Sequence, residues 1–136
     1  MKKLTSLLVM VFMAVAMLAQ QAPHRVVLHL TSADSMVYKG LFKNLHHLKE
    51  GFGDSLHIEV VMHGKGVDLM NKNTSFKEQI EKWSAKGIPF VVCENTLMER
   101  KIPKEDILPS ATFVRMGIGH LIKRQEEDWS YIKIGF

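Results

Sequence analysis

Short runs of aliphatic and β-branched residues recur along the chain, and each run is bounded by polar or turn-forming residues. Apolar runs of this length, rich in Val and Ile, are typical of buried β-strands. The pattern predicts five strands, at residues 25–30, 56–62, 88–93, 112–115 and 131–134.

The segments between the predicted strands carry the spacing of amphipathic helices. After the first strand, apolar residues recur every three or four positions and form one helical face: Tyr38, Leu41, Phe42, Leu45 and Leu48. Asp34 or Ser35 is placed to cap the start of this helix. After the second strand, Ser75 and Glu78 have the spacing of a capping box, and an apolar face follows, formed by Phe76, Ile80 and Trp83.

Three shorter elements complete the pattern. We expect a short helix over residues 95–101, a turn that begins at Pro103, and a last helix over residues 119–127. Strands that alternate with helices in this way form βαβ units. The sequence therefore predicts an open α/β domain with a mostly parallel five-stranded sheet and helices on both faces.

Open sheets of this class place their sites in the crevice beyond the carboxyl ends of the strands. Four connecting segments meet there, at residues 31–32, 63–66, 93–96 and 116–117. We expect the chemistry of the protein, if it has any, in these segments.

The first 22 residues have the three regions of a secretory signal peptide. Two lysines follow Met1, an apolar stretch runs from Leu4 to Ala19, and polar residues precede Pro23. The stretch is shorter than the roughly 20 residues of a membrane-spanning helix, and an uncleaved anchor is the alternative. We expect residues 1–22 to be removed, residues 23–136 to form one domain, and the mature protein to be periplasmic or secreted without membrane attachment.

The charge of the mature chain gives no sign of a nucleic-acid partner. Loss of Lys2 and Lys3 takes the basic count from 18 to 16, against 14 acidic residues. The net charge is then about +2, and the charges are interspersed without a basic stripe or an aromatic platform. We read them as a solvated surface.

Cys93 is the one cysteine of the chain, so no disulfide within the chain stabilises the domain. An unpaired thiol in an oxidising compartment requires either burial or a use. At the start of a predicted helix, Cys93 would face the positive end of the helix dipole, which favours the reactive thiolate. The neighbouring Glu94 opposes this effect. The alternative is that Cys93 is a small hydrophobic core residue.

His63 ends the second predicted strand and is placed to reach the same crevice as Cys93. It is a candidate proton carrier or thiolate partner. The alternative is that His63 bonds a loop carbonyl. Gly64 and Gly66 would let the backbone approach a ligand, but the segment lacks the spacing of the phosphate-binding glycine motifs.

Metal and hydrolase chemistry find no support in the sequence. None of the metal-ligand spacings HExxH, CxxC or His-x-His is present, and the adjacent His46 and His47 point in different directions on a helix. No pair of carboxylates and no nucleophilic triad has a recognisable spacing. We expect neither a metal nor a cofactor.

Three segments resemble the DsrE/DsrF-like family. They are the stretch from Phe90 to Leu97 with its continuation to Leu108, the His63-Gly64-x-Gly66 turn, and the closing Tyr131-Ile132-Lys133. The resemblance spans roughly residues 25–133. It implies a small flavodoxin-like subunit that assembles into homotrimers or hexamers.

The resemblance also implies a function. Cys93 occupies the position at which relay members of the family carry sulfane sulfur as a persulfide, so a sulfurtransferase or sulfur carrier with a thiol-bearing protein acceptor is expected. The candidate binding residues beside it are Gly64, Gly66, Glu94, Asn95 and Thr96. The export signal departs from the cytoplasmic setting of the known relays.

Two other functions stay open at this point. The first is a non-catalytic module that binds a ligand or serves as an assembly subunit, because one fold hosts many functions. The second is a nucleotide or flavin binder, which only the sheet architecture suggests. The glycine patterns do not favour this second reading.

Overall fold

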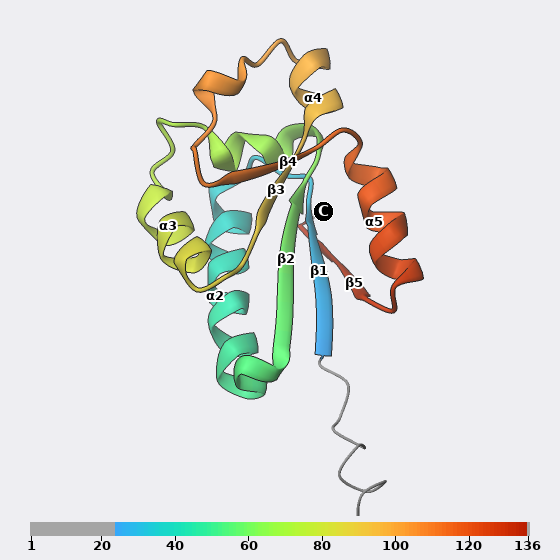
Figure 1. Ribbon diagram of the computed structural model, residues 1–136. Coiled ribbons are helices and arrows are strands. Elements are labelled where there is room, and N and C mark those ends of the chain that lie inside the picture. The colour runs from blue at the N-terminus through green and yellow to red at the C-terminus, as the bar shows by residue number, and fades with distance from the viewer. Residues whose placement is uncertain (1–23, 136) are drawn as a thin grey trace, which may run out of the picture.

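The computed structural model describes residues 24–135, which form a five-stranded sheet between two layers of helices (Figure 1). The strands are β1 (His24–Leu30), β2 (Leu56–Met62), β3 (Phe90–Cys93), β4 (Ala111–Val114) and β5 (Ser130–Ile134). Their order is β4-β3-β2-β1-β5, and all four pairings are parallel. The predicted fold class is confirmed.

Helices cover both faces of the sheet. Figure 1 shows α2 (Ser35–Phe52) and α3 (Lys77–Ala85) on one side, and α5 (Gly117–Glu126) on the other. The short α4 (Glu94–Glu99) lies beyond the carboxyl ends of the strands, as do the 3-10 segments η2 (Gly64–Met70) and η3 (Lys104–Asp106). A further 3-10 turn, η1 (Gly53–Ser55), precedes β2. This arrangement puts the strand-to-helix loops at one edge.

The larger core lies between the sheet and the α2 and α3 side. Alternate strand residues point into it, as the two-residue period of a strand requires, and they meet the predicted apolar stripe of α2. Its fully buried members include Leu30, Leu41, Leu45, Val60 and Phe90. Burial of each such side chain contributes about 1.5–3 kcal/mol, so this core supplies most of the stabilisation of the domain.

The core under α5 is smaller because one helix covers that face. It consists of Val27, Val61, Val91 and Leu121, with Val114 and Trp129 packed against it. Polar side chains fill the rest of the layer, and His29, Glu59 and Cys93 are all buried in it. The α5 face is therefore where chemistry-bearing residues enter the interior.

Most predicted boundaries are confirmed within two residues, but one cap is wrong. Ser75 and Glu78 do not form a capping box: α3 begins at Lys77, its N-cap Phe76 makes no side-chain cap bond, and the Thr74 hydroxyl accepts the Phe76 amide instead. At α2, Asp34 rather than Ser35 is the cap, because its Oδ1 accepts the Met36 amide at 2.8 Å.

The third strand begins at Phe90, two residues later than predicted. Pro89 has no amide to donate, although its carbonyl still accepts a bond from the Val60 amide. The last helix begins at Gly117 rather than at residue 119. The two extra residues bring the helix N-terminus onto the end of β3.

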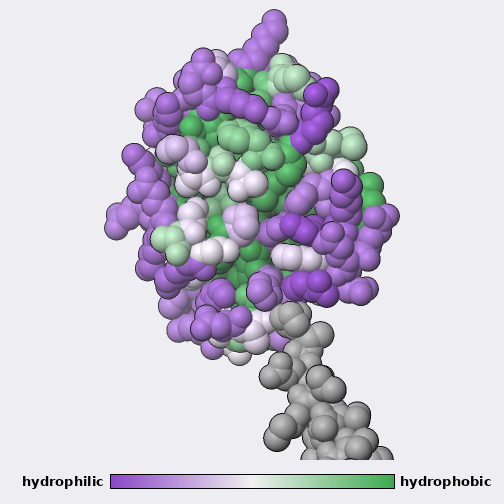
Figure 2. Space-filling view, in the orientation of Figure 1, coloured by the Kyte–Doolittle hydropathy of each residue, from purple (hydrophilic) through white to green (hydrophobic). Residues whose placement is uncertain are grey.

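The predicted signal peptide, residues 1–22, lies outside the described residues. Within residues 24–135, no helix combines the length and the apolarity needed to cross a membrane. On the face shown in Figure 2, hydrophilic side chains cover most of the rim and hydrophobic ones gather toward the middle.

Candidate functional site

Hydrogen bonds tie the carboxyl ends of the strands together. The His63 amide donates to the Leu30 carbonyl at 3.1 Å, and the Asn95 amide donates to the Arg115 carbonyl at 3.1 Å. The loops after β1, β2, β3 and β4 therefore gather at one edge, as predicted from the parallel sheet.

Cys93 is the last residue of β3 and is only 2% exposed. Its Sγ accepts a hydrogen bond from the backbone amide of Gly117 at 3.2 Å. The sequence placed this sulfur at the N-terminus of the helix that follows it, but α4 makes no cap bond to the side chain. The amide that meets the sulfur belongs to the N-terminus of α5, which carries no acidic residue in its first turn.

Gly117 is small enough to allow this contact. A Cβ at position 117 would lie 3.1 Å from Cys93 Cβ, 3.5 Å from Cys93 Sγ and 3.8 Å from His63 Cβ. Any side chain there would crowd Cys93 and force one of the two residues to give by a few tenths of an ångström. The sequence marked Gly117 only as a residue at the sheet edge, because nothing local shows which side chain it faces.

His63 follows β2 and is half-buried. A Cβ added at Gly117 would lie within 4 Å of both the His63 Cβ and the Cys93 sulfur, so the fold brings the predicted pair together. Within residues 24–135, no hydrogen bond involves the His63 ring. Neither the predicted thiolate bond nor the alternative bond to a loop carbonyl is made by this side chain.

Glu94 forms an ion pair with Lys104. The carboxylate that was expected to disfavour a thiolate on Cys93 is thereby matched by a cation from η3. Lys104 also lies over the Phe113 ring, with its Nζ 4.7 Å from the ring centroid. The local field at the sulfur is therefore less negative than the sequence alone suggests.

The other predicted binding residues make contacts within the loops themselves. The Gly64 amide donates to the buried Thr96 hydroxyl at 3.2 Å, and Arg115 Nε donates to Asn95 Oδ1 at 3.1 Å. A Cβ at Gly66 would lie 2.1 Å from the Leu30 carbonyl oxygen, so this glycine makes room for the end of β1. Their polar groups organise the loops around Cys93.

Sequence reasoning missed His29 and Tyr131. His29 is 6% exposed, and its Nδ1 lies 2.9 Å from the Tyr131 hydroxyl. Its ring centre is 6.0 Å from that of His63. Burial, with smaller contributions from the charges of His63 and Lys133, lowers the pKa of His29 to about 4. The only available signal was a histidine inside an otherwise apolar strand.

Glu59 is a second buried polar residue that the sequence did not reveal. Its carboxylate accepts hydrogen bonds from His120 Nε2 at 2.9 Å and from the Arg124 guanidinium, with Nε at 2.9 Å. Burial raises the pKa of Glu59, but the bonds from Arg124 and His120 outweigh it, so the net pKa lies below its usual value. This cluster holds the middle of α5 on the sheet.

Two hollows flank the Cys93 end of the sheet. One, of about 460 Å³, lies between Glu94, Met98 and Lys104, and the other, of about 350 Å³, lies between Met116, Gly119 and His120. Arg115 lines both of them. Both hollows therefore touch the segment from Arg115 to Gly119, and the Gly117 amide of that segment bonds the thiol.

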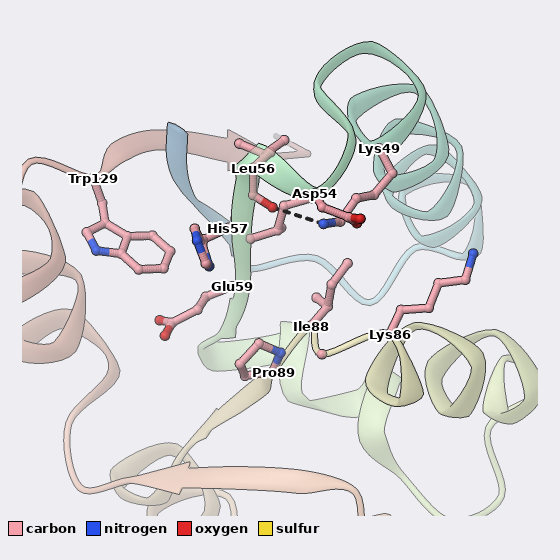
Figure 3. A pocket seen from close by; sticks show the side chains of 11 residues that line it. Lys49, Asp54, Leu56, His57, Glu59, Lys86, Ile88, Pro89 and Trp129 are labelled. Atoms are coloured by element: carbon pink, nitrogen blue, oxygen red, sulfur yellow. Dashed lines mark hydrogen bonds between the residues drawn. The ribbon is translucent and has the colours of Figure 1, made fainter. Parts of the chain in front are cut away.

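A third hollow, of about 350 Å³, lies at the amino end of the sheet. Figure 3 shows His57, Glu59 and Trp129 on one side of it and Lys49 and Lys86 on the other. Two of its polar side chains have partners inside the chain: Lys49 Nζ donates to the Leu56 carbonyl at 3.0 Å, and Glu59 is held by α5. This hollow has no visible connection to the Cys93 site.

Among residues 24–135, no three His, Cys, Asp or Glu side chains cluster closely enough to hold a metal ion. The chemistry available at the carboxyl edge is therefore that of one thiol, two neighbouring imidazoles and a helix N-terminus. This combination suits nucleophilic sulfur chemistry.

Comparison with known proteins gives a family from the sequence and similar folds among solved structures. The DsrE/DsrF-like family model matches residues 10–134. The structure is similar to that of MTH1491, a protein of unknown function from Methanobacterium thermoautotrophicum, with a TM-score of 0.78 and 30% sequence identity. That match covers 81% of this chain and 98% of the other.

A conserved protein of unknown function from Bacteroides thetaiotaomicron, BT1422, has a TM-score of 0.66 and 20% identity, covering 85% of this chain and 99% of that one. At this identity it supports the fold alone. No functionally curated protein matches the chain. The family match over nearly the whole sequence shows that the chain belongs to the DsrE/DsrF-like family.

Proposed function

We propose that this protein carries sulfane sulfur as a persulfide on Cys93 and passes it to a thiol. The observation that supports this most directly is the hydrogen bond from the Gly117 amide, at the start of α5, to Cys93 Sγ. An amide donor at a helix N-terminus stabilises negative charge on sulfur. The same donor favours the Cys93 thiolate, which is the nucleophile when sulfur is loaded and the leaving group when sulfur is passed on.

The reaction needs no oxidant and no cofactor. His63 takes the thiol proton, and the Cys93 thiolate attacks the outer sulfur of a hydropersulfide donor, R–S–SH. The bond between Sγ and that sulfur forms as the donor S–S bond breaks, and the leaving thiolate takes the proton from His63. The products are Cys93–S–SH and R–SH. An acceptor thiolate then removes the sulfur by the same exchange and restores the Cys93 thiol.

Because Cys93 is buried, the carrier must open locally before its thiol can react. At 2% exposure the thiol meets a donor only after the segment from Arg115 to Gly119 moves aside. Residues of that segment line part of both hollows at this edge. Local opening of a short segment is an ordinary native-state fluctuation. Access through the first turn of α5 is therefore part of the proposal.

Intact mass spectrometry tests the proposal. The purified protein is incubated with polysulfide, and the carrier function predicts an adduct of about 32 Da, one sulfur atom, on the wild type. Cys93→Ser removes the adduct, since the chain has no other cysteine. A wild type that gains no such mass under conditions that load a small-molecule thiol contradicts the carrier function.

The second candidate is a non-catalytic binding or assembly module of the same fold. Two observations favour it: the burial of Cys93, and exposed apolar side chains near and on α5, with Met116 54%, Ile118 43% and Ile122 51% exposed. A deletion strain separates the candidates. A Cys93→Ala gene that fully complements the deletion supports the module, whereas one that fails, with the protein present at normal level, supports the carrier.

Export, assembly and partners belong to the same proposal. The N-terminal pattern supports export to the periplasm or outside the cell, and the family resemblance supports a homotrimer or hexamer and a thiol-bearing acceptor protein. Cell fractionation tests the first. Light scattering of the purified protein tests the second, and a monomer at micromolar concentration counts against it.

A further inference from the structure

His29 is a buried histidine with one ring nitrogen that has no partner. It is 6% exposed, its Nδ1 lies 2.9 Å from the Tyr131 hydroxyl, and no partner for its Nε2 exists among residues 24–135. A buried polar atom without a hydrogen bond costs about 1–3 kcal/mol in measured cases. Most buried side-chain polar atoms avoid this cost, so the Nε2 of His29 requires an explanation.

The strand order places this nitrogen toward the Cys93 site. β1 lies between β2 and β5, so His29 has Tyr131 on the β5 side and His63 on the β2 side. Since Nδ1 faces the Tyr131 hydroxyl, Nε2 is turned away from it. The His63 ring centre is 6.0 Å from that of His29, which is too far for a direct bond and close enough to form one after a rotamer change.

His63 in turn lies next to Cys93. A Cβ at Gly117 would lie 3.8 Å from His63 Cβ and 3.5 Å from Cys93 Sγ. Tyr131, His29, His63 and Cys93 therefore follow one another across the α5 face of the sheet, from its β5 edge to the end of β3.

We propose, resting on the proposed function, that His29 is a positioning residue for Cys93. Its Nε2 accepts a hydrogen bond from His63 once His63 has taken the thiol proton. Tyr131 fixes the His29 tautomer in which Nε2 is free to accept that bond. In that state both His63 ring nitrogens carry protons, and one of them donates to His29. The Nδ1 proton of His29 donates to the Tyr131 oxygen. The thiol proton moves only from Sγ to His63.

The surrounding charges suit an acceptor at this position. Burial, assisted by His63 and Lys133, lowers the pKa of His29 to about 4, so the ring is neutral at pH 7 and has a free lone pair. Tyr131 and Lys133 face it from β5, and His63 faces it from the end of β2. The titratable groups of α5 on this face, His120 and Arg124, are turned to Glu59.

The test compares His29→Asn with His29→Gln. The asparagine amide reaches the position of Nδ1 and keeps a group for Tyr131, while the glutamine amide reaches the position of Nε2 and keeps a group for His63. The readout is the rate of Cys93 alkylation by iodoacetamide in the native protein as a function of pH. We expect the midpoint of this profile to rise by about one pH unit in His29→Asn and to stay near wild type in His29→Gln.

Three controls make the comparison decisive. His57→Asn changes an exposed histidine on the same sheet and leaves the midpoint unchanged. Circular dichroism confirms that each variant is folded. Nitrogen NMR of the imidazoles checks the tautomer: the His29 proton resides on Nδ1 in the wild type, and this preference weakens in Tyr131→Phe.

Equal midpoints in wild type and His29→Asn, or the Nε2-protonated tautomer in wild type, overturn the role of His29. A thiol that no native variant alkylates at any pH overturns it too. Failure of sulfur transfer has a different signature: the alkylation midpoints shift as expected while polysulfide adds no mass to Cys93.

Discussion

The backbone amide of Gly117 donates a hydrogen bond to the sulfur of Cys93 at 3.2 Å, across 24 positions of the sequence. This contact joins the end of a central strand to the first residue of α5. It gives a buried thiol a polar partner, and it makes α5 the lid of the candidate site. The stability of α5 and the reactivity of Cys93 are therefore linked.

Substitution of Gly117 by alanine tests this link. The new Cβ would lie 3.1 Å from Cys93 Cβ, which is tight, so we expect a small shift of the start of α5 and a cost of about 1–3 kcal/mol in the free energy of unfolding. The shift also uncovers the thiol, and we expect faster alkylation of Cys93. Urea denaturation and alkylation rates measure the two effects.

Gly40→Ala is the matched control, since Gly40 lies within α2 and a Cβ there meets nothing within 4 Å. It stabilises the protein by about 0.5–1 kcal/mol through helix propensity, with no change in alkylation. Equal behaviour of the two alanine variants would rule out the packing role of Gly117.

Replacement of Glu59 by glutamine tests the cluster that holds α5. The buried carboxylate is lost and leaves Arg124 and His120 with a neutral partner, so we expect a loss of about 2–4 kcal/mol in the free energy of unfolding. Glu127→Gln breaks the more exposed pair of the same Arg124 and costs under about 1 kcal/mol. Similar losses in both variants would show that burial of Glu59 is unimportant.

The pH dependence of stability reports on His29. Its pKa is about 4 in the folded protein and 6.5 in a model peptide, so between these values the unfolded chain binds more protons than the folded one. Stability therefore falls as the pH drops from 6.5 to about 4, by at most about 3 kcal/mol from this group.

His29→Gln has no titratable ring and should flatten this decline. Thermal or urea unfolding from pH 4 to 8 compares the variant with wild type. His57→Gln, at an exposed histidine, is expected to leave the slope unchanged. If His29→Gln keeps the wild-type dependence of stability on pH, other groups cause the decline.

Removal of the α2 cap tests whether Asp34 or Ser35 is the N-cap residue. Asp34 Oδ1 accepts the Met36 amide, so Asp34→Ala should destabilise the protein by about 1 kcal/mol. Ser35 is exposed, and Ser35→Ala should have little effect. The midpoints of urea denaturation distinguish the two, and a larger loss from Ser35→Ala would reverse the assignment.

Local patterns in the sequence determined the strands, the α2 stripe and the class of the fold. Each depends on residues within a few positions of one another, such as Leu41 and Leu45 on one helical face, or the apolar run that ends at Cys93. The same patterns led to Cys93 and His63 as candidates, because parallel strands bring their carboxyl ends to one edge.

Tertiary structure alone decided which groups from distant parts of the sequence meet. The amide of Gly117 reaches Cys93 across 24 positions, Arg124 reaches Glu59 across 65, and Tyr131 reaches His29 across 102. Strand order and the placement of α5 set these pairings, and neither leaves a local periodicity in the sequence. The burial of Cys93 was undecided for the same reason, since the residues that cover it come from the far end of the chain.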